Sequence, residues 1–141
     1  MKYHFKIHTD SEGFWAECIE FQGCVTQAAT KNELWDNMRE ALNLYLQEPN
    51  DSEFLAELPD DKLNRKTNLV QVPVDPEIAF AFMVRYHRLK RNLTQKEAAK
   101  RMGFKSLYSY QRLEKKCNAT LDMIVKIKNL FPDFSIDFAF S

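Results

Sequence analysis

One short stretch near the C-terminal end, residues 103–116 (GFKSLYSYQRLEKK), combines side chains that are typical of nucleic-acid contacts. Tyr108 offers an aromatic ring, Gln111 an amide, and Arg112 a guanidinium that can form two hydrogen bonds with a guanine edge. Residues 78–116 carry 11 Lys and Arg against two carboxylates, an excess suited to phosphate. The stretch therefore predicts a DNA-binding surface, and a charged, solvated helical bundle is the alternative.

A second group of candidates consists of acidic and histidine side chains in the first half of the chain. Metal-dependent phosphodiester cleavage needs carboxylates that converge on a cation, but Asp10, Glu17 and Glu40 fall in a predicted turn, strand and helix. His4 and His8 share a strand face, and four residues at about 3.3 Å each place them too far apart to chelate one ion. We interpret the three carboxylates as a solvated acidic surface and predict no metal site at the two histidines.

The remaining candidates give no catalytic pattern either. His87 falls on the inward side of a predicted helix, which favours a core or capping role. Cys24 and Thr26 lie in a predicted strand with no basic partner at a suitable spacing for nucleophilic catalysis. Three glycines in the whole chain do not form a phosphate-binding loop. We therefore predict a protein that is not an enzyme and needs no metal or cofactor.

The formal net charge of zero conceals two oppositely charged halves. Residues 1–75 hold 7 Lys and Arg against 14 Asp and Glu, a net charge of −7, and residues 76–141 hold 13 against 6, a net charge of +7. Such asymmetry favours two modules, a basic one for phosphate and an acidic one for a basic protein. A chance distribution of surface charge is the alternative.

The cysteines and the hydropathy pattern indicate the cellular compartment. Three cysteines without CxxC spacing, and an N-terminus without a signal-peptide pattern, predict a reduced cytoplasmic protein. No apolar run approaches the roughly 18 residues that a membrane span needs, so we expect a soluble protein with no membrane partner.

Hydrophobic periodicity predicts a β-β-β-α-β layer in the first half. Thr30 and Glu33 form a capping-box pattern at the start of its helix, which should end before Pro49. Pro73 favours an edge position for the last strand, or marks the end of its pairing. The predicted elements are strands at 3–7, 14–19 and 24–29, a helix at 31–46, a loop at 50–66 with a helical turn at 53–57, and a strand at 69–74.

Pro76 marks a boundary, after which the pattern becomes helical, with helices predicted at 78–91, 95–102, 106–115 and 121–131. Asn92 can close the first of these helices in a left-handed conformation, and Thr94 with Glu97 forms a second capping box. Gly103 provides a tight turn before the next helix. The sequence thus predicts an α+β protein with domains at 1–75 and 76–141, the second containing a helix-turn-helix.

The helical half resembles the Cro/C1-type helix-turn-helix domains of phage and bacterial repressors. The resemblance rests on Leu93-Thr94-Gln95, Ala98-Ala99, Gly103, Arg112-Leu113-Glu114 and the run from Thr120 to Leu130. It implies base contacts from the residues that open the second helix and face outward, and phosphate contacts around them. The implied DNA-binding residues, with the neighbouring lysines and Gln111, are Gln95, Lys105, Ser106, Leu107, Tyr108, Ser109, Gln111, Arg112, Lys115 and Lys116.

One residue more than the family's usual nine separates Gly103 from Glu114. The extra residue lies near 104–106 and leaves two interpretations of Leu107. Its side chain either contacts a thymine methyl group, or a shifted frame buries it.

The first 48 residues resemble the HicB antitoxin family, through Gly13–Glu17, residues 21–27, Thr30 and residues 40–42. The resemblance implies a partial ribonuclease-H-like fold and a partner, HicA, a small basic toxin that cleaves messenger RNA. It also implies an antitoxin that represses its own operon by binding double-stranded operator DNA. A stand-alone phage-type repressor with an N-terminal ligand-sensing domain is the alternative.

The last residues alternate between apolar and polar side chains, with Phe134, Ile136, Phe138 and Phe140 on one face. This pattern predicts a C-terminal strand. Pairing of that strand with a second copy would give a homodimer, or a higher homo-oligomer, that matches a palindromic operator. Packing of the segment within its own chain is the alternative.

Overall fold

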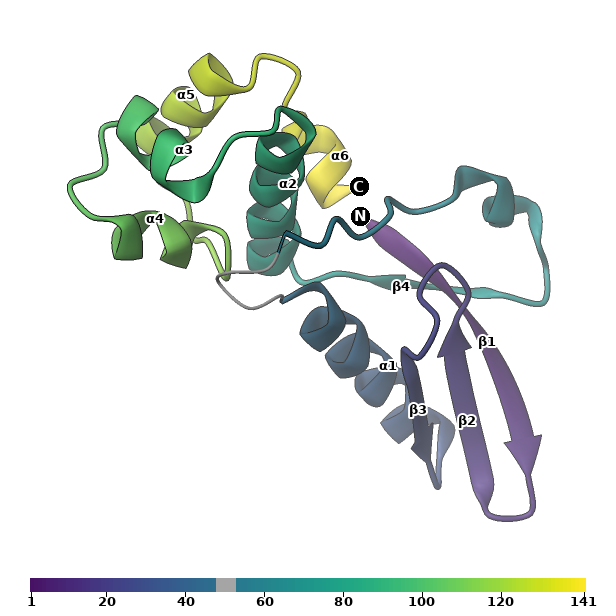
Figure 1. The fold of residues 1–141 in the computed structure, drawn as a ribbon. Coiled ribbons are helices and arrows are strands. Elements are labelled where there is room, and N and C mark those ends of the chain that lie inside the picture. The colour runs from purple at the N-terminus through teal and green to yellow at the C-terminus, as the bar shows by residue number, and fades with distance from the viewer. Residues whose placement is uncertain (48–52) are drawn as a thin grey trace. The chain divides into compact units, whose positions relative to one another are not determined.

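The structure, a computed structural model, describes residues 1–47 and 53–141 and divides the chain into two compact units (Figure 1). The sheet unit comprises Met1–Leu46 and Glu57–Asp75, and the helical unit comprises Gln47–Ala56 and Pro76–Ser141. The protein is of the mixed α+β class, as predicted. Pro49 and Asn50, predicted to follow the first helix, lie outside the described residues. None of the described helices has the length and apolar character needed to cross a membrane.

An antiparallel sheet of four strands, in the order β3-β2-β1-β4, forms one layer of the sheet unit. Tyr3 and Phe5 are completely buried, as predicted for one face of the first strand, but His4 on the opposite face is buried as well, so the predicted alternation does not hold there. Pro73 lies in an edge strand, as predicted, because its missing N–H would interrupt pairing in a central strand. The strands are β1 (Lys2–Asp10), β2 (Gly13–Cys18), β3 (Val25–Ala28) and β4 (Val70–Pro73).

Helix α1 (Lys31–Leu46) lies along one face of this sheet (Figure 1). It begins where predicted, because the Thr30 hydroxyl accepts a hydrogen bond from the Glu33 N–H at 3.2 Å. A stripe of side chains at steps of four is buried on the sheet, namely Leu34, Met38, Leu42 and Leu46.

The connection from α1 to β4 differs from the prediction. No helical turn forms at 53–57, and a 3₁₀ helix lies instead at Asp61–Arg65. Pro59 disfavours helical backbone at Leu58, the residue before it. Asp60 then caps the new turn by accepting from the Lys62 N–H at 3.0 Å.

The helical unit contains α2 to α6, and the four predicted helices are confirmed to within two residues at each end. Helix α2 is buried on nearly all sides, because residues 78–84 are all buried. Pro76 is its first residue, a position where the missing N–H costs no helical hydrogen bond. The helices are α2 (Pro76–Lys90), α3 (Gln95–Arg101), α4 (Leu107–Leu113), α5 (Leu121–Leu130) and α6 (Ile136–Phe140).

The C-terminal segment is the short helix α6, so the predicted strand is wrong. The Ser135 hydroxyl caps this helix by accepting from the Phe138 N–H at 3.1 Å. Phe134 and Ala139 are buried against α2, where the ring of Phe134 meets Phe80 edge-on at 5.1 Å. A lone strand would leave its backbone groups unpaired here, whereas a helix bonds them internally.

Candidate nucleic-acid interface on α3 and α4

A buried ion pair joins α2 to the end of α4. Arg88 Nε donates to Glu114 Oε1 at 2.6 Å, and both side chains are 3% exposed. The same oxygen accepts from the Tyr110 hydroxyl at 3.0 Å, and Glu114 Oε2 accepts from Gln95 Nε2 at 2.7 Å. Burial, aided by the Glu114 charge, raises the pKa of Tyr110 and keeps its hydroxyl a donor. This cluster therefore ties α2, α3 and α4 together.

The start of α3 and its two flanking turns form as predicted. Thr94 Oγ1 accepts from the Glu97 N–H at 3.0 Å, and Glu97 Oε1 accepts from the Thr94 N–H at 3.4 Å. Asn92 has φ 54° and Gly103 has φ 77°, the left-handed conformation that asparagine and glycine tolerate best. Local sequence signals thus set where α3 begins and where the chain turns toward α4.

The connection from Gly103 to α4 leaves Leu107 at the surface. Phe104 N–H donates to the Ala99 carbonyl at 2.9 Å, and its ring packs edge-on against Tyr110 at 5.7 Å. Leu107, the first residue of α4, is 42% exposed. The additional residue in the connection therefore does not bury Leu107.

Tyr108 and Arg112 form the centre of the exposed face of α4. They lie four residues apart, so their side chains share one side of the helix, and Tyr108 is 65% exposed. The buried face of the same helix carries Tyr110 and Leu113. The predicted DNA-binding residues that are exposed are Lys105, Ser106, Leu107, Tyr108, Ser109, Arg112, Lys115 and Lys116.

Four of the predicted residues also support α4 from within the helical unit. Ser106 caps the helix by accepting from the Ser109 N–H at 3.2 Å, and the two hydroxyls lie 2.9 Å apart. Gln95 and Gln111 are half-buried, and Gln111 Nε2 donates to Gln95 Oε1 at 3.1 Å. Part of their hydrogen-bonding capacity is thus used to hold α3 and α4 in place.

The surface of α3 and α4 is strongly positive. Within residues 95–116 the carboxylate of Glu114 is neutralised by Arg88 in the core, which leaves Glu97 as the exposed acidic side chain of that range. Lys116 lies 3.3 Å from Glu77, in an ion pair at the surface. The exposed cations are Lys96, Lys100, Arg101, Lys105, Arg112, Lys115 and Lys116.

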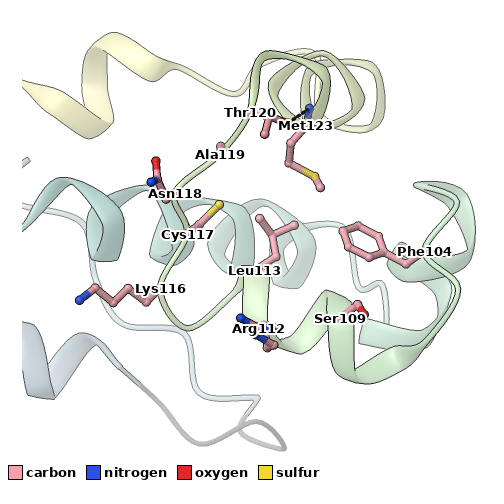
Figure 2. A pocket seen from close by; sticks show the side chains of 10 residues that line it. All are labelled: Phe104, Ser109, Arg112, Leu113, Lys116, Cys117, Asn118, Ala119, Thr120 and Met123. Atoms are coloured by element: carbon pink, nitrogen blue, oxygen red, sulfur yellow. Dashed lines mark hydrogen bonds between the residues drawn. The ribbon is translucent and has the colours of Figure 1, made fainter.

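A pocket of about 370 Å³ opens between α4 and the start of α5 (Figure 2). Its apolar lining comes from Phe104, Leu113, Cys117 and Met123, whose side chains point into the space in Figure 2. Burial raises the pKa of Cys117 to about 11, so its thiol is protonated at neutral pH. The polar rim is formed by Ser109, Arg112, Lys116, Asn118 and Thr120.

No protein-family model matches the chain, and no curated protein matches it.

The three carboxylates considered as metal ligands in the sheet unit do not converge on one point. Asp10 accepts from the Glu12 N–H at 2.8 Å, in the turn between β1 and β2. Glu17 lies 3.3 Å from His8 Nε2, and Glu40 is exposed on α1. Among residues 1–47 and 53–141, no three His, Cys, Asp or Glu side chains lie in a group that could hold a metal ion.

Two histidines outside this surface, His4 and His87, are buried and contact other residues of their own unit. His4 is 2% exposed, with Nδ1 2.8 Å from Glu20 Oε2 and Nε2 2.7 Å from Asn64 Oδ1. This network joins β1 to the 3₁₀ helix and was not predicted, because its members lie 16 and 60 residues apart in sequence. His87 is buried beside the Phe131 ring, at 5.8 Å between centroids, as its predicted inward position requires.

Proposed function

We propose that the protein is an antitoxin that neutralises a HicA-like, mRNA-cleaving toxin by direct binding and represses its own operon through a helix-turn-helix made of α3 and α4. The observation that carries the DNA-binding half is the exposed face of α4. Tyr108 and Arg112 lie there, on a helix that the buried Arg88–Glu114 pair ties to α2. Residues 96–116 carry seven exposed Lys and Arg side chains, and Arg112 is one of them. Such a combination favours phosphate contacts with positioned base-reading side chains.

In this proposal α4 enters the major groove of double-stranded operator DNA. Arg112 binds a guanine edge through two hydrogen bonds, and the exposed Leu107 contacts a thymine methyl group. Lys105 and Lys115 contact phosphates on either side, and the hydroxyls of Ser106 and Ser109 lie close to the backbone at the start of α4. In this arrangement the base contacts of Arg112 and Leu107 provide sequence specificity, and the phosphate contacts provide most of the affinity.

Fluorescence anisotropy with DNA from upstream of the gene tests these roles. Arg112→Ala should cost about 1–3 kcal/mol on the operator and relax preference at one base pair. Lys115→Ala should weaken binding to all duplexes alike and reduce the slope of log K against log salt by about 1. Lys66→Ala, at an exposed lysine of the sheet unit, is the matched control and should change neither. Equal behaviour of all three variants would contradict the proposal.

The acidic character of the sheet unit supports the antitoxin half. Met1–Leu46 and Glu57–Asp75 together hold 7 Lys and Arg against 11 Asp and Glu, a net charge of −4. Opposite charge accelerates encounter with a basic ribonuclease and favours it over acidic proteins. The sheet unit therefore suits a basic protein partner better than a nucleic acid.

The direct test is a ribonuclease assay with the basic protein encoded by the neighbouring gene. Titration of that toxin with the full chain should abolish mRNA cleavage near a one-to-one ratio, and the inhibition should weaken as salt is raised. If the product of the neighbouring gene is not toxic, or if it still cleaves mRNA at a saturating concentration of the full chain, the antitoxin assignment is wrong. A repressor with a ligand-sensing first unit would then be the better account.

A further inference from the structure

Two cysteines lie opposite each other where β2 ends and β3 begins. The register of these strands pairs Glu17 with Val25, so the next pair along the ladder is Cys18 with Cys24. The Cys18 N–H donates to the Cys24 carbonyl at 2.9 Å, which extends the ladder by one bond. Opposed residues of an antiparallel pair point to the same face, and both cysteines are buried, at 5% and 4% exposure. Backbone pairing therefore brings the two sulfur atoms together inside the sheet unit.

The backbone spacing of this pair suits a disulfide. Hydrogen-bonded partners in an antiparallel ladder have Cα atoms about 5.5 Å apart, and disulfides span Cα separations of about 4.4–6.8 Å. The Cys24 N–H turns back to the Phe21 carbonyl at 3.2 Å, so the ladder ends at this pair. A sulfur–sulfur bond therefore needs little backbone movement.

The two thiols differ in acidity. Hydrogen bonding by the Cys18 thiol lowers the pKa of Cys24 below its usual range. The same contact, together with burial and the charge of Glu20, raises the pKa of Cys18. Glu20 Oε1 accepts from the Cys18 thiol at 3.8 Å. Cys24 thus supplies a thiolate and Cys18 a protonated thiol, and the thiolate is the form that reacts with oxidants.

We infer that Cys18 and Cys24 form a reversible intramolecular disulfide when the protein meets hydrogen peroxide. The Cys24 thiolate attacks one peroxide oxygen, the O–O bond breaks and hydroxide leaves, so that Cys24 becomes a sulfenic acid. The Cys18 sulfur then attacks the Cys24 sulfur, and the Cys18 proton leaves with the hydroxyl group as water. The two sulfurs together lose two electrons, which reduce the peroxide. A reducing cytoplasm returns the pair to two thiols.

Burial determines the class of oxidant and the choice of cysteine. With both side chains at 5% exposure or less, a small hydroperoxide reaches the sulfurs more readily than a bulky disulfide such as oxidised glutathione. Cys117, the third cysteine, belongs to the helical unit. Burial raises its pKa to about 11, so it offers little thiolate at neutral pH. The site is therefore confined to the pair in the sheet unit.

The disulfide closes a ring over a segment that anchors the sheet unit. Within residues 18–24, Phe21 stacks on the Tyr45 ring at 4.5 Å between centroids, and Glu20 Oε1 accepts from the His4 N–H at 2.9 Å. A cross-link restricts this segment in the unfolded chain and so stabilises the folded unit. Oxidation therefore makes the unit open less often, which protects it from proteolysis. This inference does not rest on the proposed function.

Thiol counting and mass spectrometry of the full chain test the disulfide. Reduced wild type should show three thiols in denaturant, one after treatment with hydrogen peroxide, and three again after dithiothreitol. The tryptic peptide 7–31, which contains both cysteines of the pair, should lose two hydrogens on oxidation. Cys117→Ser is the matched control and should go from two thiols to none. Three thiols that survive the peroxide, or a disulfide that includes Cys117, overturn the inference.

Dimedone, which labels sulfenic acids, tests the roles of the two sulfurs. Cys18→Ser removes the thiol that closes the disulfide, so peroxide should leave Cys24 as a sulfenic acid that dimedone labels. Cys24→Ser should leave Cys18 unlabelled, because its thiol stays protonated. Far-UV circular dichroism confirms that each variant is folded. Equal labelling of the two variants contradicts the assignment of Cys24 as the attacking sulfur.

Urea titration tests the effect of the bond on the sheet unit. Tryptophan fluorescence follows this unit, since Trp15 and Trp35 both belong to it. Oxidised wild type should unfold at a urea concentration roughly 1 M higher than reduced wild type, and peroxide-treated Cys24→Ser should show no such rise. A midpoint that stays or falls on oxidation refutes the stabilising role. Neither DNA nor toxin is present, so failure of the proposed function would leave these results unchanged.

Discussion

Replacing Glu114 by glutamine should destabilise the helical unit severely. The change leaves the Arg88 guanidinium, which is 3% exposed, without its counter-charge, and it disturbs the carboxylate that Tyr110 and Gln95 also bind. Breaking a buried pair by removing one partner costs about 3–5 kcal/mol, because the remaining charge cannot reach water. A helical unit of this size has a total stability of about 3–10 kcal/mol, so a large share of it is lost.

The two tryptophans of the chain, Trp15 and Trp35, make the measurement specific to one unit. Both lie in the sheet unit, so tryptophan fluorescence follows that unit, whereas far-UV ellipticity is dominated by α2 to α6. In urea titrations Glu114→Gln should lower the midpoint of the ellipticity transition and leave the fluorescence transition in place.

Glu97→Gln is the matched control, since it makes the same chemical change at an exposed carboxylate that bonds only the start of its own helix. Its cost should stay near 1 kcal/mol or below. Arg88→Met combined with Glu114→Gln should recover part of the loss, because the unpaired charge is gone. A loss for Glu114→Gln that is no larger than that for Glu97→Gln would refute the view that the ion pair positions α4.

Two further changes probe the cap of α3 and a buried histidine. Thr94→Ala removes the hydroxyl that accepts from Glu97 N–H and should cost the helical unit about 0.5–2 kcal/mol in urea titrations, whereas Thr67→Ala, at an exposed threonine of the sheet unit, should cost it nothing measurable. Burial lowers the pKa of His87 below 6.5, so between the folded and unfolded pKa values the unfolded chain binds more protons. Stability of the helical unit should therefore be complete above pH 6.5 and fall as the pH drops below it. His87→Gln should flatten that fall in Tm, and an unchanged pH dependence would show that another group controls it.

Local signals account for the parts of the fold that the sequence predicted. Thr30 and Thr94 mark helix starts because a cap bonds an amide only three residues away, a distance the sequence displays directly. Asn92 and Gly103 mark turns for a similarly local reason, because a turn at these positions depends on the positive φ of the residue itself. The exposed face of α4 could be predicted because the helical period of 3.6 residues per turn places Tyr108 and Arg112 on the same side of the helix.

Contacts between distant residues decided the parts that the sequence did not predict. The alternation of Phe134 and Ile136 with polar neighbours fits a strand, but Phe80 on α2 offers a surface to a helix and no strand to pair with. The pairing of Arg88 with Glu114 joins residues 26 positions apart, and no spacing rule identifies it. Likewise the pocket beside Arg112 depends on the segment 116–120, which lines it together with residues of α4 and α5 and whose pattern carries no helix or strand signal.

Sequence preference in DNA binding tests the central claim most directly. At one fixed salt concentration, the affinity of the full chain for DNA from upstream of its own gene is compared with its affinity for an unrelated duplex of equal length. If α4 reads bases through Arg112 and its exposed neighbours, the operator should bind about 10³-fold more tightly or better. Equal affinity for the two duplexes would show that the positive surface of α3 and α4 attracts phosphate alone, and would contradict a repressor function.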